Sequence, residues 1–161
     1  MTLRILLSIA AALAWLGADA TSAQDRKPSK KEIDAIRACA VKYANDASEA
    51  ERRCLFNLVA DPCTKRTKIA SDRDRMECFD LERAIWDDLL NENFKTLREG
   101  LDDDQRNKLR DMQRAWIAYR DTTCGFYYDK IQGTMANMMI AACQARETAR
   151  RAILLAFFAT L

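Results

Sequence analysis

The sequence predicts an all-α fold, a small disulfide-stapled bundle of about four to five helices. Three observations support it. Glycine and proline are scarce, with four and two residues in a chain of 161, which favours long helices over strands and turns. Apolar residues recur at helical steps of three, four or seven. Six cysteines follow a segment typical of a secretory signal, and an even set in that setting indicates disulfides.

Residues 1–23 are expected to be a signal peptide. Arg4 provides a short basic start, Ile5 to Leu16 form an apolar stretch, and small residues follow. Of two candidate cleavage sites, after Ala20 and after Ala23, we favour the second. The apolar stretch falls short of the roughly 20 residues that span a bilayer. We therefore expect a periplasmic or secreted protein without a transmembrane segment in its mature chain.

The charged residues nearly balance, with 26 basic against 24 acidic side chains and a net charge of +2. Removing the signal peptide takes away Arg4 and Asp19, one charge of each sign, so the balance is unchanged. A near-neutral value does not indicate a nucleic-acid partner. The interspersed signs are typical of solvated helix faces.

The first helix is expected to begin at Ser29, after a loose leader over residues 24–29. Ser29 and Glu32 have the spacing of a capping box, in which two side chains bond the N–H groups left free at a helix start. The apolar residues that follow at helical spacing are Ile33, Ile36, Ala40 and Tyr43.

The second helix is expected to open at Ser48, which has capping-box spacing with Glu51. Its apolar side carries Leu55, Leu58 and Val59. We expect Asp61-Pro62 to end it, because proline lacks the backbone N–H and restricts the residue before it.

A long third helix is expected from Ser71 or Asp72. Its apolar stripe consists of Met76, Phe79, Trp86, Leu90, Phe94 and Leu97. Three acidic residues are available for the opposite side, namely Asp87, Asp88 and Glu92. Gly100 and Asp102 are expected to stop this helix and start the next, and the acidic run from Asp102 favours the positive end of the helix dipole.

The last two helices are expected to form a hairpin. The first of them carries Leu109, Met112, Trp116 and Tyr119 and runs past Cys124. Gly133 breaks it by taking a left-handed backbone position, and Thr134 is expected to cap a final helix with its methionines on the apolar side. That final helix bears Met138, Ala142, Ala145, Ala149 and Ala152. The apolar segment 152–161 is expected to lie beneath the N-terminal helices; a partner or self-association surface is the alternative.

The cysteines contain an internal repeat that predicts their pairing. Cys39 and Cys54 have the same separation as Cys63 and Cys78, and each pair spans a polar turn and a helix start. The repeat favours local bridges within each pair, which leaves Cys124 and Cys143 to each other. A crossing pair between Cys54 and Cys63 is the alternative. A zinc site is disfavoured, because the chain has no histidine and no C-x-x-C pair.

The chain lacks the usual signatures of an enzyme or of a cofactor. Without histidine it has no Ser-His-Asp or Cys-His arrangement, and it contains neither a G-x-S-x-G motif nor a phosphate-binding loop. We therefore expect no catalytic residue, no metal and no cofactor.

The segment around Trp116 carries a specific motif. Its residues fit Q-x-x-W-x-x-Y-R-x-x-x-C, then G-T-M, a further cysteine and T-x-x-R. The matching positions are Gln113, Trp116, Tyr119, Arg120, Cys124, Gly133, Thr134, Met135, Cys143, Thr148 and Arg151. This combination resembles the LprI-like N-terminal domain family, small secreted bacterial proteins named for a lysozyme inhibitor. The resemblance covers about residues 61–158 and includes Cys63 and Cys78.

We expect three parts: a signal peptide over 1–23, an N-terminal helical extension over 24–60 that the resemblance does not explain, and, as the resemblance implies, an LprI-like helical domain over 61–161. The resemblance also implies a secreted, disulfide-bonded binding protein that inhibits lysozyme-type cell-wall glycosidases. The alternative is a non-catalytic structural or interaction module of the bacterial cell envelope, with a partner other than a lysozyme. For that alternative, the apolar tail or the basic leader would make the contact.

Most of the motif residues are expected to be structural. Trp116 and Tyr119 are expected in the core, because aromatic residues on an apolar stripe usually bury. Arg120 is expected to satisfy helix-end carbonyls or a carboxylate inside the bundle, and Gln113 to bond to the loop. Arg151 is expected to pair with an acidic side chain or to remain a solvated charge.

The candidate partner-binding residues are two tyrosines and three acids. Tyr127 and Tyr128 precede the bend at the end of their helix. An acidic side with Asp87, Asp88 and Glu92 would steer a cationic lysozyme.

Overall fold

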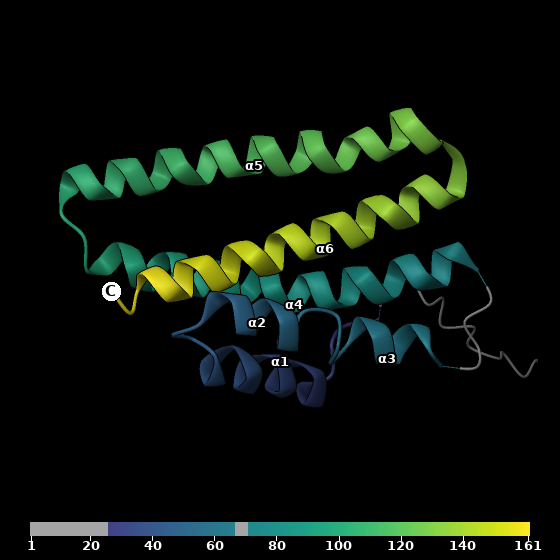
Figure 1. Cartoon of the computed structure of the whole chain (residues 1–161), viewed down its shortest axis with the longest axis horizontal. Coiled ribbons are helices and arrows are strands. Elements are labelled where there is room, and N and C mark those ends of the chain that lie inside the picture. The colour runs from purple at the N-terminus through teal and green to yellow at the C-terminus, as the bar shows by residue number, and fades with distance from the viewer. Residues whose placement is uncertain (1–25, 67–70) are drawn as a thin grey trace, which may run out of the picture.

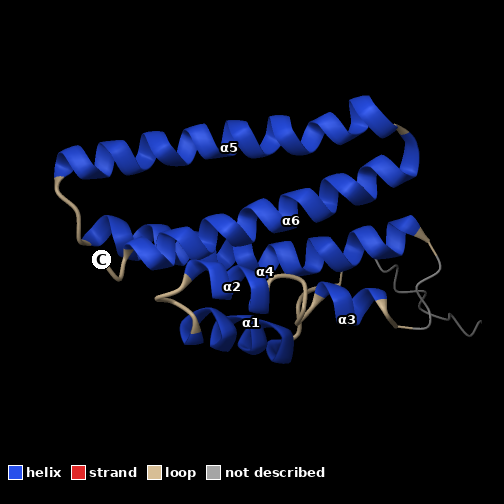
Figure 2. Cartoon of the chain, viewed as in Figure 1, coloured by secondary structure: helices blue, strands red, loops and turns tan. Residues whose placement is uncertain are grey.

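The computed structural model describes residues 26–66 and 71–161, and the expected signal peptide lies outside them. In this part of the chain it contains six helices and no strand (Figures 1 and 2). The helices are α1 (Lys30–Lys42), α2 (Ala47–Cys54), α3 (Ala60–Thr64), α4 (Asp72–Glu99), α5 (Asp103–Ile131) and α6 (Gly133–Phe158). The all-α fold class is confirmed, with one short helix more than expected. None of these helices combines the length and apolar character that a membrane crossing requires.

Capping boxes start three of the helices where the sequence predicts them. Ser29 accepts from the backbone N–H of Glu32 at the start of α1. Ser71 opens α4 and Asp102 opens α5, where the box partner is Gln105. Each box satisfies N–H groups that have no partner within the helix.

The start of α2 differs from the prediction. Asp46, rather than Ser48, is the N-cap, and its side chain accepts from the backbone N–H of Glu49 at 3.0 Å. Aspartate caps as well as serine, so the earlier residue takes the position and Ser48 falls inside the helix. The predicted box between Ser48 and Glu51 is therefore wrong.

The predicted end of α2 is also wrong. The helix stops at Cys54, so the expected apolar side over residues 55–59 does not form. Phe56 takes a left-handed φ of 65°, which interrupts the helix. Pro62 then lies in the first turn of the short α3, where a missing N–H costs nothing because that group has no helical partner.

The core lies between α4 and α6, which run side by side (Figure 1), with α1 and α2 packed beside them. Asn93 donates to the carbonyl of Ala152 at 2.9 Å and ties the two long helices together. The buried residues of this core are Ile36, Ala50, Cys54, Val59, Leu81, Ile85, Trp86, Leu89, Leu90, Leu109, Ala149, Ala152, Ile153 and Leu155. The apolar C-terminal segment is thus taken up by the core, with α4 as well as the N-terminal helices covering it.

Three disulfides join consecutive cysteines, as the spacing repeat predicts. The pairs are Cys39–Cys54, Cys63–Cys78 and Cys124–Cys143. They link α1 to α2, α3 to α4, and α5 to α6 respectively. Each bridge therefore fixes one helix to the helix that follows it.

Helix α5 is much less covered than the other long helices. It packs mainly on α6, along the side opposite α1 (Figure 1). Only Leu109 and Cys124 are buried among its 29 residues. Tyr119 was expected in the core but is 54% exposed, because the described residues cover α5 mainly along its contact with α6.

Candidate functional site

Part of the motif lies where α5 and α6 face each other, between the buried residues Leu109 and Cys124 of α5. We call the set of Gln113, Trp116 and Arg120 from α5, with Thr148 and Arg151 from α6, the α5–α6 seam. Gln113 Oε1 accepts from Arg151 Nε at 2.8 Å. Arg151 is only 5% exposed and Thr148 only 1%. The helical spacing of the motif thus brings its polar residues to one contact line.

Two guanidinium groups lie against the same indole in the seam. The Cζ atom of Arg120 is 4.9 Å from the centre of the Trp116 ring, and that of Arg151 is 5.8 Å from it. Both distances fall within the range of cation–π attraction. The Trp116 ring therefore supports two positive charges, one near the surface and one buried.

The seam corrects three expected roles. Gln113 bonds to Arg151 rather than to a loop. Arg151 is neither solvated nor paired with any acidic side chain of the described residues, because its position on α6 faces Gln113 and Trp116. Arg120 pairs with its neighbour Asp121 at 2.8 Å near the surface, and not with a buried carboxylate or with helix-end carbonyls.

Two buried polar atoms of the seam have no hydrogen-bond partner among the described residues. They are Thr148 Oγ1 and Arg151 Nη2. Their residues are three positions apart on α6 and so lie on one face of the helix. Burial lowers the pKa of Arg151, because the charged guanidinium has lost water without gaining an anion.

The bend between α5 and α6 departs partly from the prediction. Gly133 has a φ of 69°, the left-handed position expected of it, and Gln132 shares that region with a φ of 62°. Gln132 is the N-cap of α6 and makes no side-chain cap bond. Two successive left-handed residues complete the turn before Thr134, so the expected Thr134 cap is not present.

Exposed apolar side chains gather on α5 and at this bend. Six of the eight large hydrophobic residues exposed in the described part of the chain lie there, so this is where a partner would find apolar surface. We call Tyr128, Ile131 and Met135, with exposed fractions of 55%, 41% and 54%, the hinge patch. Met135 was expected to fill the apolar side, but it precedes the part of α6 that enters the core. Tyr127 is half-buried beside the patch.

The acidic candidate residues lie elsewhere. Asp87, Asp88 and Glu92 are exposed on α4. Arg37 of α1 forms two hydrogen bonds to Glu92, at 2.7 and 2.5 Å, and this partner lowers the pKa of the Glu92 carboxyl. Because α1 and α5 lie on opposite sides of α6, the acidic set and the two tyrosines do not form one surface (Figure 1).

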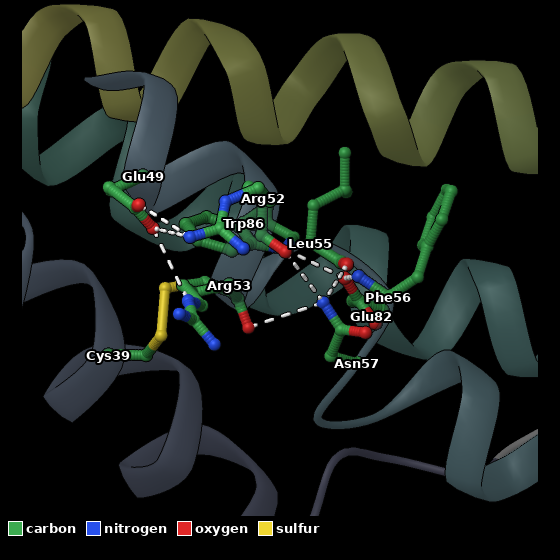
Figure 3. Close-up of a disulfide and its surroundings, with 10 residues drawn as sticks. Cys39, Glu49, Arg52, Arg53, Leu55, Phe56, Asn57, Glu82 and Trp86 are labelled. Carbon is green, nitrogen blue, oxygen red and sulfur yellow. Dashed lines mark hydrogen bonds and ion pairs between the residues drawn. A yellow bond between two sulfur atoms is a disulfide. The ribbon is translucent and has the colours of Figure 1, made fainter. Parts of the chain in front are cut away.

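A buried carboxylate that sequence reasoning missed holds the loop between α2 and α3 (Figure 3). Glu82 is fully buried and accepts from the backbone N–H groups of Phe56 and Ala60, both at 2.8 Å. It also accepts from Trp86 Nε1 at 3.1 Å. Burial raises the pKa of Glu82 against the opposing effect of these three donors. Glu82 lies on the predicted apolar stripe between Phe79 and Trp86, and this position could have indicated that its side chain is buried.

Basic residues border a cavity of about 650 Å³ where the end of α4 meets the start of α5. Its lining residues are Phe94, Arg98, Asp103, Arg106, Asn107 and Arg110. Arg106 is held by Asp103 at 3.0 Å and by the carbonyl of Arg98. The carboxylate of Asp103 partly offsets the positive charge of the arginines that line this cavity.

Within the described ranges, His, Cys, Asp and Glu side chains form no group of three or more that could hold a metal ion. In a comparison with known families, a family model described as lysozyme inhibitor LprI matches residues 63–155, more than half of the chain. No curated protein and no solved structure matches.

Proposed function

Since the chain belongs to the LprI family of lysozyme inhibitors, we propose that it is a secreted binding protein that blocks a lysozyme-type cell-wall glycosidase and catalyses nothing itself. We assign residues 1–23 to a signal peptide, 24–60 to an N-terminal extension and 61–161 to the LprI-like domain. Three disulfides and the absence of a free cysteine from the described residues support a location in the periplasm or outside the cell.

The hinge patch is the observation that carries this proposal. Glycosidases of this type hold two carboxylates in a cleft, so an inhibitor needs only a rigid projection that occludes the cleft. Tyr128 and Ile131 are one helical turn apart, and Cys124 staples their helix to α6 just before them. A stapled bend binds without a large ordering cost, and exposed aromatic side chains are frequent anchors of interfaces.

The acidic side of α4 has a smaller part in the proposal. Asp87 and Asp88 are exposed and would attract a cationic enzyme from a distance. Glu92 is already engaged by Arg37, and the hinge patch lies on another part of the molecule. We therefore assign the direct contact to the hinge patch with Tyr127, and long-range steering to Asp87 and Asp88.

The direct test is a turbidity assay of bacterial cell-wall lysis with purified protein. We expect a molar excess of the protein to protect the cells. Replacing Tyr128 and Met135 together by alanine is expected to raise the half-protecting concentration about tenfold or more, as for the loss of an interface anchor. Val41→Ala is the matched control, since Val41 is 78% exposed but lies on α1.

Two results would reject the proposal. Absence of protection at large excess would show that the protein does not inhibit the lysozyme tested. Absence of protection against a panel of lysozymes of different classes would reject lysozyme inhibition as its function. Equal protection by wild type, Val41→Ala and the hinge double variant would reject the hinge patch as the contact. Circular dichroism of each variant shows that the fold is intact.

The alternative, an envelope module that docks through its ends, receives less support. The core takes up Ala152, Ile153 and Leu155 from the apolar tail. In the basic leader, Arg26 pairs with Glu32 and Lys30 with Asp34, each at 2.6 Å. Part of the apolar and basic surface that this function would use is therefore already engaged within the described chain.

A further inference from the structure

Arg151 is a buried charge without a counter-charge among the described residues. Within them its one hydrogen bond runs from Nε to the neutral amide of Gln113, and its guanidinium lies against the Trp116 ring. Burying a charge that is not paired is costly. An aromatic face and one amide offset part of that cost, and an anion in the seam would offset much more.

The seam contains hydrogen-bond donors and positive charge, which are what an anion requires. Arg151 Nη2 is a donor without a partner among the described residues, and so is the hydroxyl of Thr148 on the same face of α6. Arg120 adds a second guanidinium over the same Trp116 ring. The acids nearby are already engaged, since Asp121 pairs with Arg120 and Glu147 pairs with Arg150.

We propose that the α5–α6 seam is a binding site for a carboxylate group. A carboxylate has two oxygens that accept from separate donors, and Nη2 of Arg151 and the hydroxyl of Thr148 are two such donors. The side chain of Arg120 is 21% exposed and pairs with its neighbour Asp121. In this proposal Arg120 moves aside from Trp116 to admit the ligand, a movement that breaks no hydrogen bond to the core among the described residues.

The carboxylate has two possible sources. It is either a free small carboxylate or an acidic side chain of the glycosidase bound under the proposed function. The second source rests on that function, whereas the first does not. A test on the isolated protein therefore comes first.

The first experiment titrates the protein with sodium acetate, against sodium chloride at equal ionic strength. Intrinsic tryptophan fluorescence and the thermal unfolding midpoint are followed together. We expect a saturable fluorescence change and a rising midpoint with acetate only. The matched variants are Arg151→Met and Thr148→Val, which keep side-chain volume but remove the donors, and Arg110→Met, which removes an arginine of α5 away from the seam. Arg110→Met should respond like wild type, and Arg151→Met should not respond.

The stability of Arg151→Met separates a binding site from a structural arginine. A charge kept for ligand binding costs stability in the free protein, so its replacement by methionine is expected to leave the midpoint unchanged or to raise it. A structural arginine would give a lower midpoint. The proposal is overturned if acetate and chloride act alike on wild type, or if Arg151→Met retains the acetate response.

A lysis assay with Arg151→Met then identifies the source. Loss of both the acetate response and protection assigns the carboxylate to the enzyme. Loss of the acetate response with protection retained assigns it to a small free carboxylate. If wild type responds to acetate but protects against no lysozyme, the proposed function fails while the carboxylate site stands.

Discussion

The loop around Glu82 and the seam around Arg151 each bury one charged side chain, but they treat it differently. Glu82 receives three hydrogen bonds, two of them from backbone N–H groups. Arg151 donates one hydrogen bond and leaves Nη2 without a partner among the described residues. Glu82 lies between helices that pack closely, whereas Arg151 faces α5, which is mostly exposed.

The difference separates a structural charge from one that is available for binding. The bonds to Glu82 hold Phe56, which has a left-handed φ, and join the α2–α3 loop to α4, so both carboxylate oxygens of Glu82 serve the fold. The donors in the seam are only partly used by the fold. Regions with few buried contacts are also those that open most easily, so the seam opens on the side formed by α5, while its free donors belong to α6.

Replacing Glu82 by alanine should have the largest effect. Three donors would be left buried without a partner, at about 1–3 kcal/mol each, less the relief of a buried charge. We expect a net loss of about 3–5 kcal/mol in the free energy of unfolding, measured by urea denaturation. Asp88→Ala on the same helix is the control, with a change within about 0.5 kcal/mol. A similar small change in both variants would contradict the structural role of Glu82.

Removal of the Cys124–Cys143 bridge should come next. Replacing both cysteines by serine opens a sequence separation of 19 residues, and the chain-entropy model gives a loss of about 3 kcal/mol. Hydrogen exchange is expected to accelerate in α5 more than in α4, because little else holds α5 down. Uniform acceleration across both helices would show that α5 is as firmly bound as the core.

Replacing either of two glycines by alanine should have a smaller effect on stability, with opposite signs at the two positions. A Cβ atom at Gly125 or at Gly133 would meet nothing within 4 Å, but only Gly133 has a positive φ. Gly125→Ala should stabilise α5 by about 0.5–1 kcal/mol. Gly133→Ala should destabilise the bend by about 1–2 kcal/mol. Thermal unfolding of both variants measures the contrast, and shifts of the same sign would refute the assigned conformation of the bend.

The smallest expected effect is a pH dependence that comes from Glu82. Burial raises the pKa of its carboxyl above the ordinary value of 4.5, so the folded state binds a proton that the unfolded state releases. The contribution of Glu82 to the free energy of unfolding is fully present below pH 4.5. It is lost as the pH rises through the pKa of Glu82 in the folded protein. Glu82→Gln should remove this slope in urea denaturation at several pH values. An unchanged slope would assign it to other groups.

The sequence predicts the helices well where one local signal decides them. Ser29, Ser71 and Asp102 each have a suitable capping partner three residues later, and the equal cysteine spacing predicts the bridges. The predictions were wrong where tertiary contacts decide. Phe56 leaves the helix because Glu82, 26 residues away, binds its N–H group. Tyr119 is exposed because α5 packs mainly on α6 and buries only two of its residues, which helical periodicity does not reveal.

The sequence predicts which residues belong to the candidate site but not which of them contact one another. The spacing of Gln113, Trp116 and Arg120 places them on one face of a helix, but a sequence does not state which side chain lies opposite. The unpaired state of Arg151 depends on the partner helix presenting an amide rather than an acid. Distances between helices and the burial of single atoms decide that outcome, and both arise only in the folded chain.

The disulfides pair the cysteines consecutively in chain order: the first with the second, the third with the fourth, and the fifth with the sixth. A chain that crosses a membrane N-terminus first therefore presents each pair before the next one emerges. An oxidant that joins thiols as they appear will form the native set without having to undo earlier bonds. Maturation of this protein should then depend on a thiol oxidant but not on a disulfide isomerase.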